Sequence, residues 1–164
     1  MVSYTTGVFP KSYIPTVFES FSKSIIVNER EYRTNLWDTA GQEEYEELRT
    51  LMYENVSVYI VCFSVNDRNS FDAIQQKWMS EIHPRNEVKA PIILVGTKAD
   101  LRDSSSTNVI SQREAQKLKR EIKAVCYLEC SALTREGLEN VFETATKVAA
   151  KIFVKQHDRK CTML

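Results

Sequence analysis

The sequence predicts an α/β fold, a mostly parallel sheet with helices on both faces. Two observations support this prediction. Continuous apolar runs alternate with segments whose apolar residues recur at helical spacing, and polar segments follow the apolar runs. Unbroken apolar strands are typical of parallel sheets, because helices cover both faces of such strands. Right-handed crossovers are expected to join them.

The first expected element after a turn-rich opening is an antiparallel hairpin. Residues 20–27 and 32–37 read as strands, and the polar segment Asn28-Glu29-Arg30 between them is typical of a turn. Three further strands are expected at 58–65, 91–95 and 125–128. Cys62 lies within the first of these apolar runs and is predicted to be a core residue.

Helices are expected between and after these strands. The first helix presents Phe71, Ile74 and Trp78 on one face, and the second presents Ala115, Leu118 and Ile122. Ser111 and Glu114 fit a capping box at the start of the second helix. The longest apolar stripe consists of Leu138, Val141, Phe142, Ala145, Val148, Ala149 and Ile152. The sequence therefore predicts one domain over 1–154 and a short tail over 155–164.

Composition excludes several classes of protein. A chain of 164 residues with 43% hydrophobic and 27% charged residues is typical of one globular domain and not of a disordered chain. Its 22 basic residues balance its 22 acidic ones, so no nucleic acid is expected as a partner. The four cysteines include no C-x-x-C pair, and neither a signal peptide nor a membrane-spanning apolar stretch is recognisable. A reducing, cytosolic setting without disulfides is therefore expected.

Glycine is scarce, and this limits the kinds of phosphate-binding loop. The four glycines are Gly7, Gly41, Gly96 and Gly137. Because tens of residues separate them, neither G-x-G-x-x-G nor G-x-x-x-x-G-K-[ST] can be written anywhere in the sequence.

The polar segment Asp38-Thr-Ala-Gly-Gln-Glu-Glu44 follows the strand that ends at Trp37, where ligands of open α/β sheets bind. Asp38 can hold Mg²⁺ through water, and Gly41 lets a backbone N–H approach a terminal phosphate. Gln42 can orient a water molecule for attack on that phosphate. Taken alone, a polar turn with a helix N-cap is the simpler interpretation.

Two more polar segments follow strands. In Thr97-Lys-Ala-Asp100, the Asp100 carboxylate can accept hydrogen bonds from guanine N1–H and N2–H₂, an edge that adenine lacks, while the Lys98 stem packs on the base. A loop with solvated charges is again the simpler interpretation of this segment alone. Backbone N–H groups of Glu129-Cys-Ser-Ala-Leu133 could reach guanine O6. Because all three segments follow successive strands, they are expected to converge on one crevice.

Several segments together resemble the Rho family of Ras-like small GTPases, most closely its Rac branch. They are Tyr13-Ile-Pro-Thr-Val-Phe-Glu19, Trp37-Asp-Thr-Ala-Gly-Gln-Glu43, Lys77-Trp78, Pro91-Ile-Ile-Leu-Val-Gly-Thr-Lys98 and Glu129-Cys-Ser-Ala-Leu-Thr134. The resemblance covers residues 3–164. It implies a Ras-like GTPase fold and a GTP/GDP-controlled switch in signal transduction that regulates the actin cytoskeleton and hydrolyses GTP with Mg²⁺.

The resemblance also implies roles for individual residues. Gln42 is the catalytic glutamine of the second switch, and Thr16 and Asp38 are the metal ligands. The implied nucleotide-binding residues are Thr16, Asp38, Thr39, Ala40, Gly41, Gln42, Thr97, Lys98, Asp100, Leu101, Ser131, Ala132 and Leu133. The implied effector-binding residues are Tyr13, Ile14, Pro15, Thr16, Val17, Phe18, Glu19, Ser20 and Phe21. Effectors, exchange factors, GTPase-activating proteins and a dissociation inhibitor are the implied protein partners.

The last four residues, Cys161-Thr-Met-Leu164, fit the C-a-a-X pattern. A terminal Leu favours geranylgeranylation of Cys161 and removal of the three residues after it. Lys155, Arg159 and Lys160 form only a weak basic patch beside the lipid site. The protein is therefore expected in the cytoplasm and reversibly on the cytosolic face of membranes, the plasma membrane in particular.

The sequence departs from the family pattern in two places. The family begins with a strand, a G-x-x-x-x-G-K-[ST] loop and a helix, and residues 1–6 are expected to be the end of that helix. The domain is thus expected to be N-terminally truncated, without the first strand and the P-loop. The segment 101–129 has room only for a loop, one helix and a short strand, where the family usually carries an extra helical insert.

Three interpretations of function remain open from the sequence. The first is a Rho/Rac-like switch whose beginning is absent from the sequence. The second is a shortened, membrane-tethered module or decoy that binds effectors and hydrolyses nothing. The third is a fragment that is degraded after synthesis. The coding sequence upstream of Met1 would discriminate the first from the others.

Overall fold

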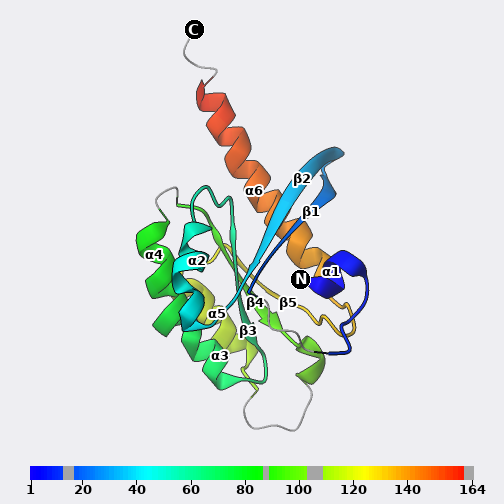
Figure 1. Ribbon diagram of the computed structural model, residues 1–164, viewed down its shortest axis with the longest axis vertical. Coiled ribbons are helices and arrows are strands. Elements are labelled where there is room, and N and C mark those ends of the chain that lie inside the picture. Colours follow the sequence, from blue (N-terminus) through cyan, green and yellow to red (C-terminus); the bar gives the residue numbers. More distant parts are fainter. Residues whose placement is uncertain (13–16, 87–88, 103–108, 161–164) are drawn as a thin grey trace.

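A computed structural model describes residues 1–12, 17–86, 89–102 and 109–160, with side chains as far as 151 (Figure 1). The elements in chain order are α1 (Val2–Thr6), β1 (Phe18–Val27), β2 (Arg30–Thr39), η1 (Glu43–Tyr45), α2 (Glu46–Leu51), β3 (Tyr59–Ser64), α3 (Arg68–Ala73), η2 (Ile74–Met79), α4 (Ser80–Arg85), β4 (Ile92–Thr97), η3 (Ala99–Leu101), α5 (Gln112–Glu121), β5 (Cys126–Glu129) and α6 (Leu138–Lys160). The segments η1 and η3 are 3₁₀ turns, and η2 is π-helical.

The predicted hairpin is confirmed. Strands β1 and β2 pair antiparallel from Phe18 opposite Thr39 to Val27 opposite Arg30, so the ladder extends beyond the predicted strands. Asn28 and Glu29 at the tip both adopt left-handed φ angles of 49° and 63°. Two successive left-handed residues are the mark of a type I′ turn, whose twist matches that of the paired strands.

The predicted parallel strands form a separate sheet in the order β3-β4-β5. Val61 lies opposite Leu94, and Val95 opposite Leu128. The central strand β4 is buried over most of its length, with Ile93 fully enclosed, because elements pack on both of its faces. The mixed α/β architecture expected from the sequence is thus confirmed.

Two apolar clusters occupy the two faces of the parallel sheet. Phe63 and Leu94 belong to the cluster formed with α3, η2, α4 and α5. Ile93 and Val95 belong to the other cluster, which includes Leu36 of the hairpin and the inner face of α6. Figure 1 shows α3, α4 and α5 gathered on one side of the molecule and α1 with α6 on the other. The helix α1 docks by stacking the Tyr4 ring on Phe142 of α6, with 3.8 Å between ring centroids.

The prediction that Cys62 lies in the core is wrong, since this residue is exposed. Its neighbours Val61 and Phe63 are buried, because alternate residues of a strand point to opposite faces. Cys62 points to the other face of the sheet, and within the described residues β3 is an edge strand, so no strand beyond it helps to cover that side chain. An apolar run shows that a strand is largely enclosed, but not that each of its positions is.

The first predicted helix is a continuous helical segment built from α3, η2 and α4. Asp67 caps its start by accepting hydrogen bonds from the N–H groups of Asn69 and Ser70. The predicted capping box of Ser111 and Glu114 is confirmed at α5. Between 101 and 129 the described residues hold the end of η3, α5 and β5, and residues 103–108 lie outside the description. The helix α6 continues to Lys160, beyond the predicted apolar stripe.

Replacing Gly137 by alanine is expected to destabilise the fold by about 2 kcal/mol or more. Gly137 has a φ of +67°, and a Cβ atom there would lie 2.3 Å from the Glu129 carbonyl oxygen. The left-handed conformation alone costs an alanine roughly 1–2 kcal/mol, and the backbone clash adds to that cost. Urea unfolding would measure the effect.

Gly7→Ala is the matched control, because Gly7 also has a positive φ of +79° but its nearest neighbour would be 3.7 Å away. Equal losses of stability in the two variants would show that the contact with Glu129 contributes nothing.

Candidate functional site

The loops that follow β4 and β5 lie in direct contact. The Ala99 N–H donates to the Cys130 carbonyl at 3.1 Å, and the Cys130 N–H donates to the Gly96 carbonyl at 2.9 Å. Parallel neighbouring strands bring their carboxyl ends to one edge of the sheet, as expected. The segments 97–101 and 129–133 are therefore neighbours, as their positions in the sequence predicted.

The first of these loops presents charged side chains to solvent. Lys98 adopts a left-handed φ of 56°, and both Lys98 and Asp100 are exposed. Thr97 is half-buried, and its hydroxyl donates to the Phe63 carbonyl at 3.0 Å. Leu101 closes the η3 turn and is 36% exposed. The Asp100 carboxylate is thus free of burial costs and available to a ligand.

The second loop is held by a buried serine. The Ser131 side chain is fully enclosed, and its Oγ accepts hydrogen bonds from the N–H groups of Leu133 at 3.2 Å and Thr134 at 3.1 Å. Ala132 and Leu133 are exposed beside it. This turn fixes the backbone of the loop with respect to the end of β5.

A partly buried network that the sequence did not predict supports both loops. Arg102 donates to Glu129 through Nε at 2.7 Å and Nη2 at 2.6 Å, and through Nη1 to the Ile110 carbonyl at 2.7 Å. Tyr127 donates to Glu129 at 2.6 Å, and burial together with this bond raises the pKa of Tyr127. A Cβ on Gly96 would lie 2.7 Å from the Tyr127 hydroxyl, so only glycine leaves room for the network.

The third polar segment begins at the end of β2. Asp38 and Thr39 are half-buried, and the N–H of buried Ala40 donates to the Val17 carbonyl at 3.2 Å. Gly41 and Gln42 follow and are exposed. The predicted catalytic residue is therefore accessible to a ligand.

Neighbouring parallel strands account for the contact between the loops after β4 and β5, but β2 belongs to the separate two-stranded sheet. The expected convergence of the third segment with the other two therefore stays a prediction.

Some predicted residues lie outside the described residues. They are Tyr13, Ile14, Pro15, Thr16 and Cys161. The remainder of the predicted effector segment starts at exposed Val17 and continues along β1. Phe18 contacts Trp37 of β2, with 5.5 Å between ring centroids, while Phe21 packs against the α6 side of the core. Trp37 is 54% exposed, a large apolar surface for a single side chain.

A second buried network was not predicted, and it contacts the Gln42 segment. Arg49 of α2 donates to Glu81 of α4 through Nε at 2.8 Å and Nη2 at 2.7 Å. Tyr53 also donates to Glu81. Desolvation alone would raise the pKa of Glu81, but the hydrogen bonds from Arg49 and Tyr53 outweigh it and lower that pKa below its ordinary value. The sequence offers only a weak signal for this pair. Glu81 stands close to Met79 and Ile82, which are both buried. A carboxylate that is buried beside them needs a hydrogen-bonding or oppositely charged partner.

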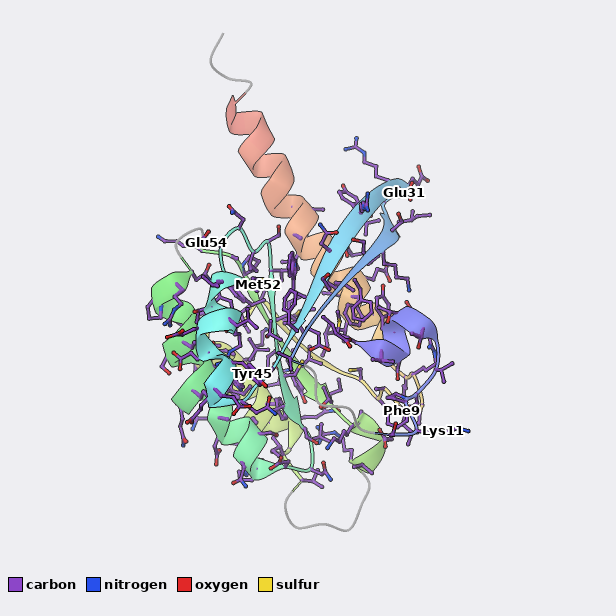
Figure 2. The ribbon with its side chains drawn as sticks, in the orientation of Figure 1. Phe9, Lys11, Glu31, Tyr45, Met52 and Glu54 are labelled. Atoms are coloured by element: carbon purple, nitrogen blue, oxygen red, sulfur yellow. The ribbon has the colours of Figure 1, made fainter. Side chains whose placement is uncertain are left out.

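The chain segments before and after the hairpin lie on opposite sides of the molecule. Figure 2 shows Tyr45, Met52 and Glu54 on the side of α2 to α5, and Phe9 and Lys11 on the side of α1. Glu31 marks the far tip of the hairpin (Figure 2). The Gln42 segment, which precedes Tyr45, therefore runs from the hairpin toward the helices of the first group.

The described residues contain no group of three or more His, Cys, Asp or Glu side chains that could hold a metal ion by themselves. One carboxylate, Asp38, lies at the end of β2. This donor set fits Mg²⁺, which proteins commonly bind through one or two carboxylates together with phosphate oxygens and water. In the described part of the chain, no helix combines the length and apolar character that a membrane crossing requires.

The chain was compared with models of known protein families. The family model described as the Ras family matches residues 1–151 of the chain. The match includes the hairpin, both groups of helices and all three polar segments that follow strands.

Proposed function

The chain belongs to the Ras family of small GTPases, which act as guanine-nucleotide switches, and from this membership we propose that it is a Rho/Rac-like switch in signal transduction. The contact between the two loops after β4 and β5 is the observation that carries the proposal. It places the exposed Asp100 carboxylate beside the backbone of 130–133. The Rac branch and a role in actin regulation are supported by the resemblance of segments such as 13–19 and Lys77-Trp78.

Guanine recognition uses the exposed end of the parallel sheet. Asp100 accepts hydrogen bonds from guanine N1–H and N2–H₂, and the Lys98 stem packs along the base. In this proposal the Ala132 N–H serves O6, because the N–H groups of Ser131 and Leu133 already donate to the Glu136 carbonyl and to Ser131 Oγ. Ser131 and Leu133 line the same loop, which the Ser131 turn fixes. Adenine lacks the N2–H₂ donor and a protonated N1, so this set of groups favours guanine.

The phosphate end of the nucleotide lies toward β2 in this proposal. Thr16 and Asp38 hold Mg²⁺, which neutralises phosphate charge when bound. Thr39, Ala40 and Gly41 line the same side, with the Gly41 N–H toward the terminal phosphate. Gln42 orients the attacking water, and a GTPase-activating protein supplies an arginine in trans.

Protein partners and location complete the proposal. Residues 13–21 bind effectors, and exposed Val17 and Trp37 offer apolar contact area beside them. Exchange factors and a dissociation inhibitor act on the same switch. Geranylgeranylated Cys161 attaches the protein reversibly to the cytosolic face of membranes, in particular the plasma membrane.

Gln42→Leu is expected to lower the single-turnover rate of GTP hydrolysis by roughly tenfold or more, because leucine cannot orient a water molecule. GDP affinity should stay unchanged, since Gln42 is exposed and the base site is elsewhere. The measurement uses the purified full chain loaded with radiolabelled GTP. The matched control is Gln116→Leu, an exposed glutamine of α5.

Two results would contradict this proposal in different ways. Equal rates of GTP hydrolysis in Gln42→Leu and the wild type would show that Gln42 takes no part in the reaction. A chain that binds no guanine nucleotide but still binds Rho-family effectors would favour the alternative, a membrane-tethered binding module without hydrolysis.

A further inference from the structure

We propose that Arg49 is a positioning residue for the phosphate end of the site, because it holds the backbone of 40–42 so that the Gly41 N–H faces the terminal phosphate. The inference rests on the proposed function and deepens it. Arg49 is not expected to touch the nucleotide. It acts through the loop that carries Gly41 and Gln42.

Three successive carbonyl groups of this loop accept hydrogen bonds from cationic side chains. Arg49 Nη1 donates to the Ala40 carbonyl at 2.6 Å and to the Gln42 carbonyl at 3.1 Å. Lys77 Nζ donates to the Gly41 carbonyl at 2.8 Å. Hydrogen bonds from charged donors are stronger than neutral ones, so the loop is held on the side that faces α2 and η2.

This arrangement sets the direction of the amide N–H groups. In a trans peptide the N–H of each residue points opposite to the carbonyl of the residue before it, and the described chain has no cis peptide. The Gly41 N–H therefore points away from Arg49, and the Gln42 N–H points away from Lys77. Neither has a hydrogen-bond partner among the described residues. The Gly41 N–H is thus a fixed and unpaired donor, which is suited to an anionic oxygen.

The burial of the Arg49–Glu81 pair explains why position 49 requires an arginine. The Arg49 and Glu81 side chains are 3% and 5% exposed, and the Trp78 ring covers the guanidinium at 5.2 Å. Glu81 occupies Nε and Nη2, which leaves Nη1 directed at the loop. A lysine ammonium lacks the planar fork and cannot serve the carboxylate and both carbonyls in this geometry.

Stability alone does not account for such a pair. Replacing a buried ion pair by apolar residues of similar volume is often neutral or stabilising. The triple variant Arg49→Met, Tyr53→Phe, Glu81→Leu uses this property, because it removes every charge and hydroxyl of the network together. It is expected to regain most of the stability that substitution of one partner alone would lose, while the Ala40 carbonyl loses its Arg49 donor and the Gln42 carbonyl keeps only the Tyr45 N–H at 3.3 Å.

The test compares GTP hydrolysis, GDP affinity and urea unfolding in the full chain. Both Arg49→Lys and the triple variant are expected to hydrolyse GTP roughly tenfold to 100-fold more slowly, with GDP affinity within about twofold of the wild type. Lys77→Met, which frees only the Gly41 carbonyl, should give a smaller loss. Arg68→Lys is the matched control, because Arg68 forms a 2.8 Å ion pair with Glu114 on the surface, between α3 and α5.

The outcomes separate this inference from the proposed function. A triple variant that recovers both stability and the wild-type rate would overturn the inference and leave Arg49 a purely structural residue. An equal loss of rate in Arg68→Lys would overturn it as well, because that arginine does not contact the loop. A wild-type chain that hydrolyses no GTP would instead overturn the proposed function, and the inference with it.

Discussion

Asp100→Asn is expected to lower GDP affinity by about 100-fold or more without a change in the stability of the chain. Hydrogen bonds to a charged group contribute roughly 1.5–3 kcal/mol each, and the Asp100 carboxylate accepts two of them from guanine in the proposed complex. Asparagine keeps one acceptor and turns an N–H₂ donor toward the N–H groups of the base. Stability should not change, because Asp100 is exposed.

The same chemistry predicts an exchange of specificity. Xanthine carries a carbonyl oxygen where guanine carries N2–H₂, so an asparagine amide can donate to it. Asp100→Asn should therefore bind xanthosine diphosphate more tightly than GDP, and the wild type should show the reverse order. Competition against a fluorescent nucleotide would measure both affinities.

Asp72→Asn supplies the control, since Asp72 is an exposed aspartate of α3, outside the loops after β4 and β5. If Asp100→Asn and Asp72→Asn bind GDP equally well, Asp100 does not contact the base. In that case the resemblance of 97–100 to a guanine-binding segment would carry no function in this chain.

Local sequence patterns predicted most of the fold. The strands at 58–65 and 91–95 were visible because parallel strands covered on both faces are apolar throughout. The hairpin was visible because polar residues interrupt two strand-like segments at 28–30. Cys62 shows the limit of such patterns, because the exposure of a single side chain depends on which elements pack beside its strand.

The candidate site was predictable only where it follows from topology. Strands that run parallel end at the same edge, so contact between 97–101 and 129–133 follows from their places after two such strands. The two ion-pair networks, one buried and one partly buried, could not be predicted in this way. Arg49 and Glu81 are 32 residues apart, and Arg102 and Glu129 are 27 apart, so their pairing depends on how separate elements pack. No periodicity in the sequence marks which charged residue will be enclosed.

Glu81→Leu alone is expected to destabilise the chain by about 3–5 kcal/mol, the largest loss of stability expected of any single substitution considered. The substitution leaves the Arg49 guanidinium buried without its counter-charge. Removing one partner of a buried ion pair typically lowers the free energy of unfolding by about 3–5 kcal/mol. Tyr53 loses its acceptor at the same time. Urea unfolding of the single and triple variants would measure the difference between a broken network and a removed one.

The pH dependence gives a second measurement of the same pair. Because the folded pKa of Glu81 lies below its ordinary value, its contribution to stability is complete above about pH 4.3 and is lost as pH falls through the folded pKa. The free energy of unfolding of the triple variant should therefore fall less on acidification than that of the wild type. Glu139→Gln serves as the control, since Glu139 pairs with Arg135 on the surface and should change stability by less than about 0.5 kcal/mol. Parallel acid profiles of the triple variant and the wild type would mean that the Glu81 carboxylate gains no net stabilisation from Arg49 and Tyr53.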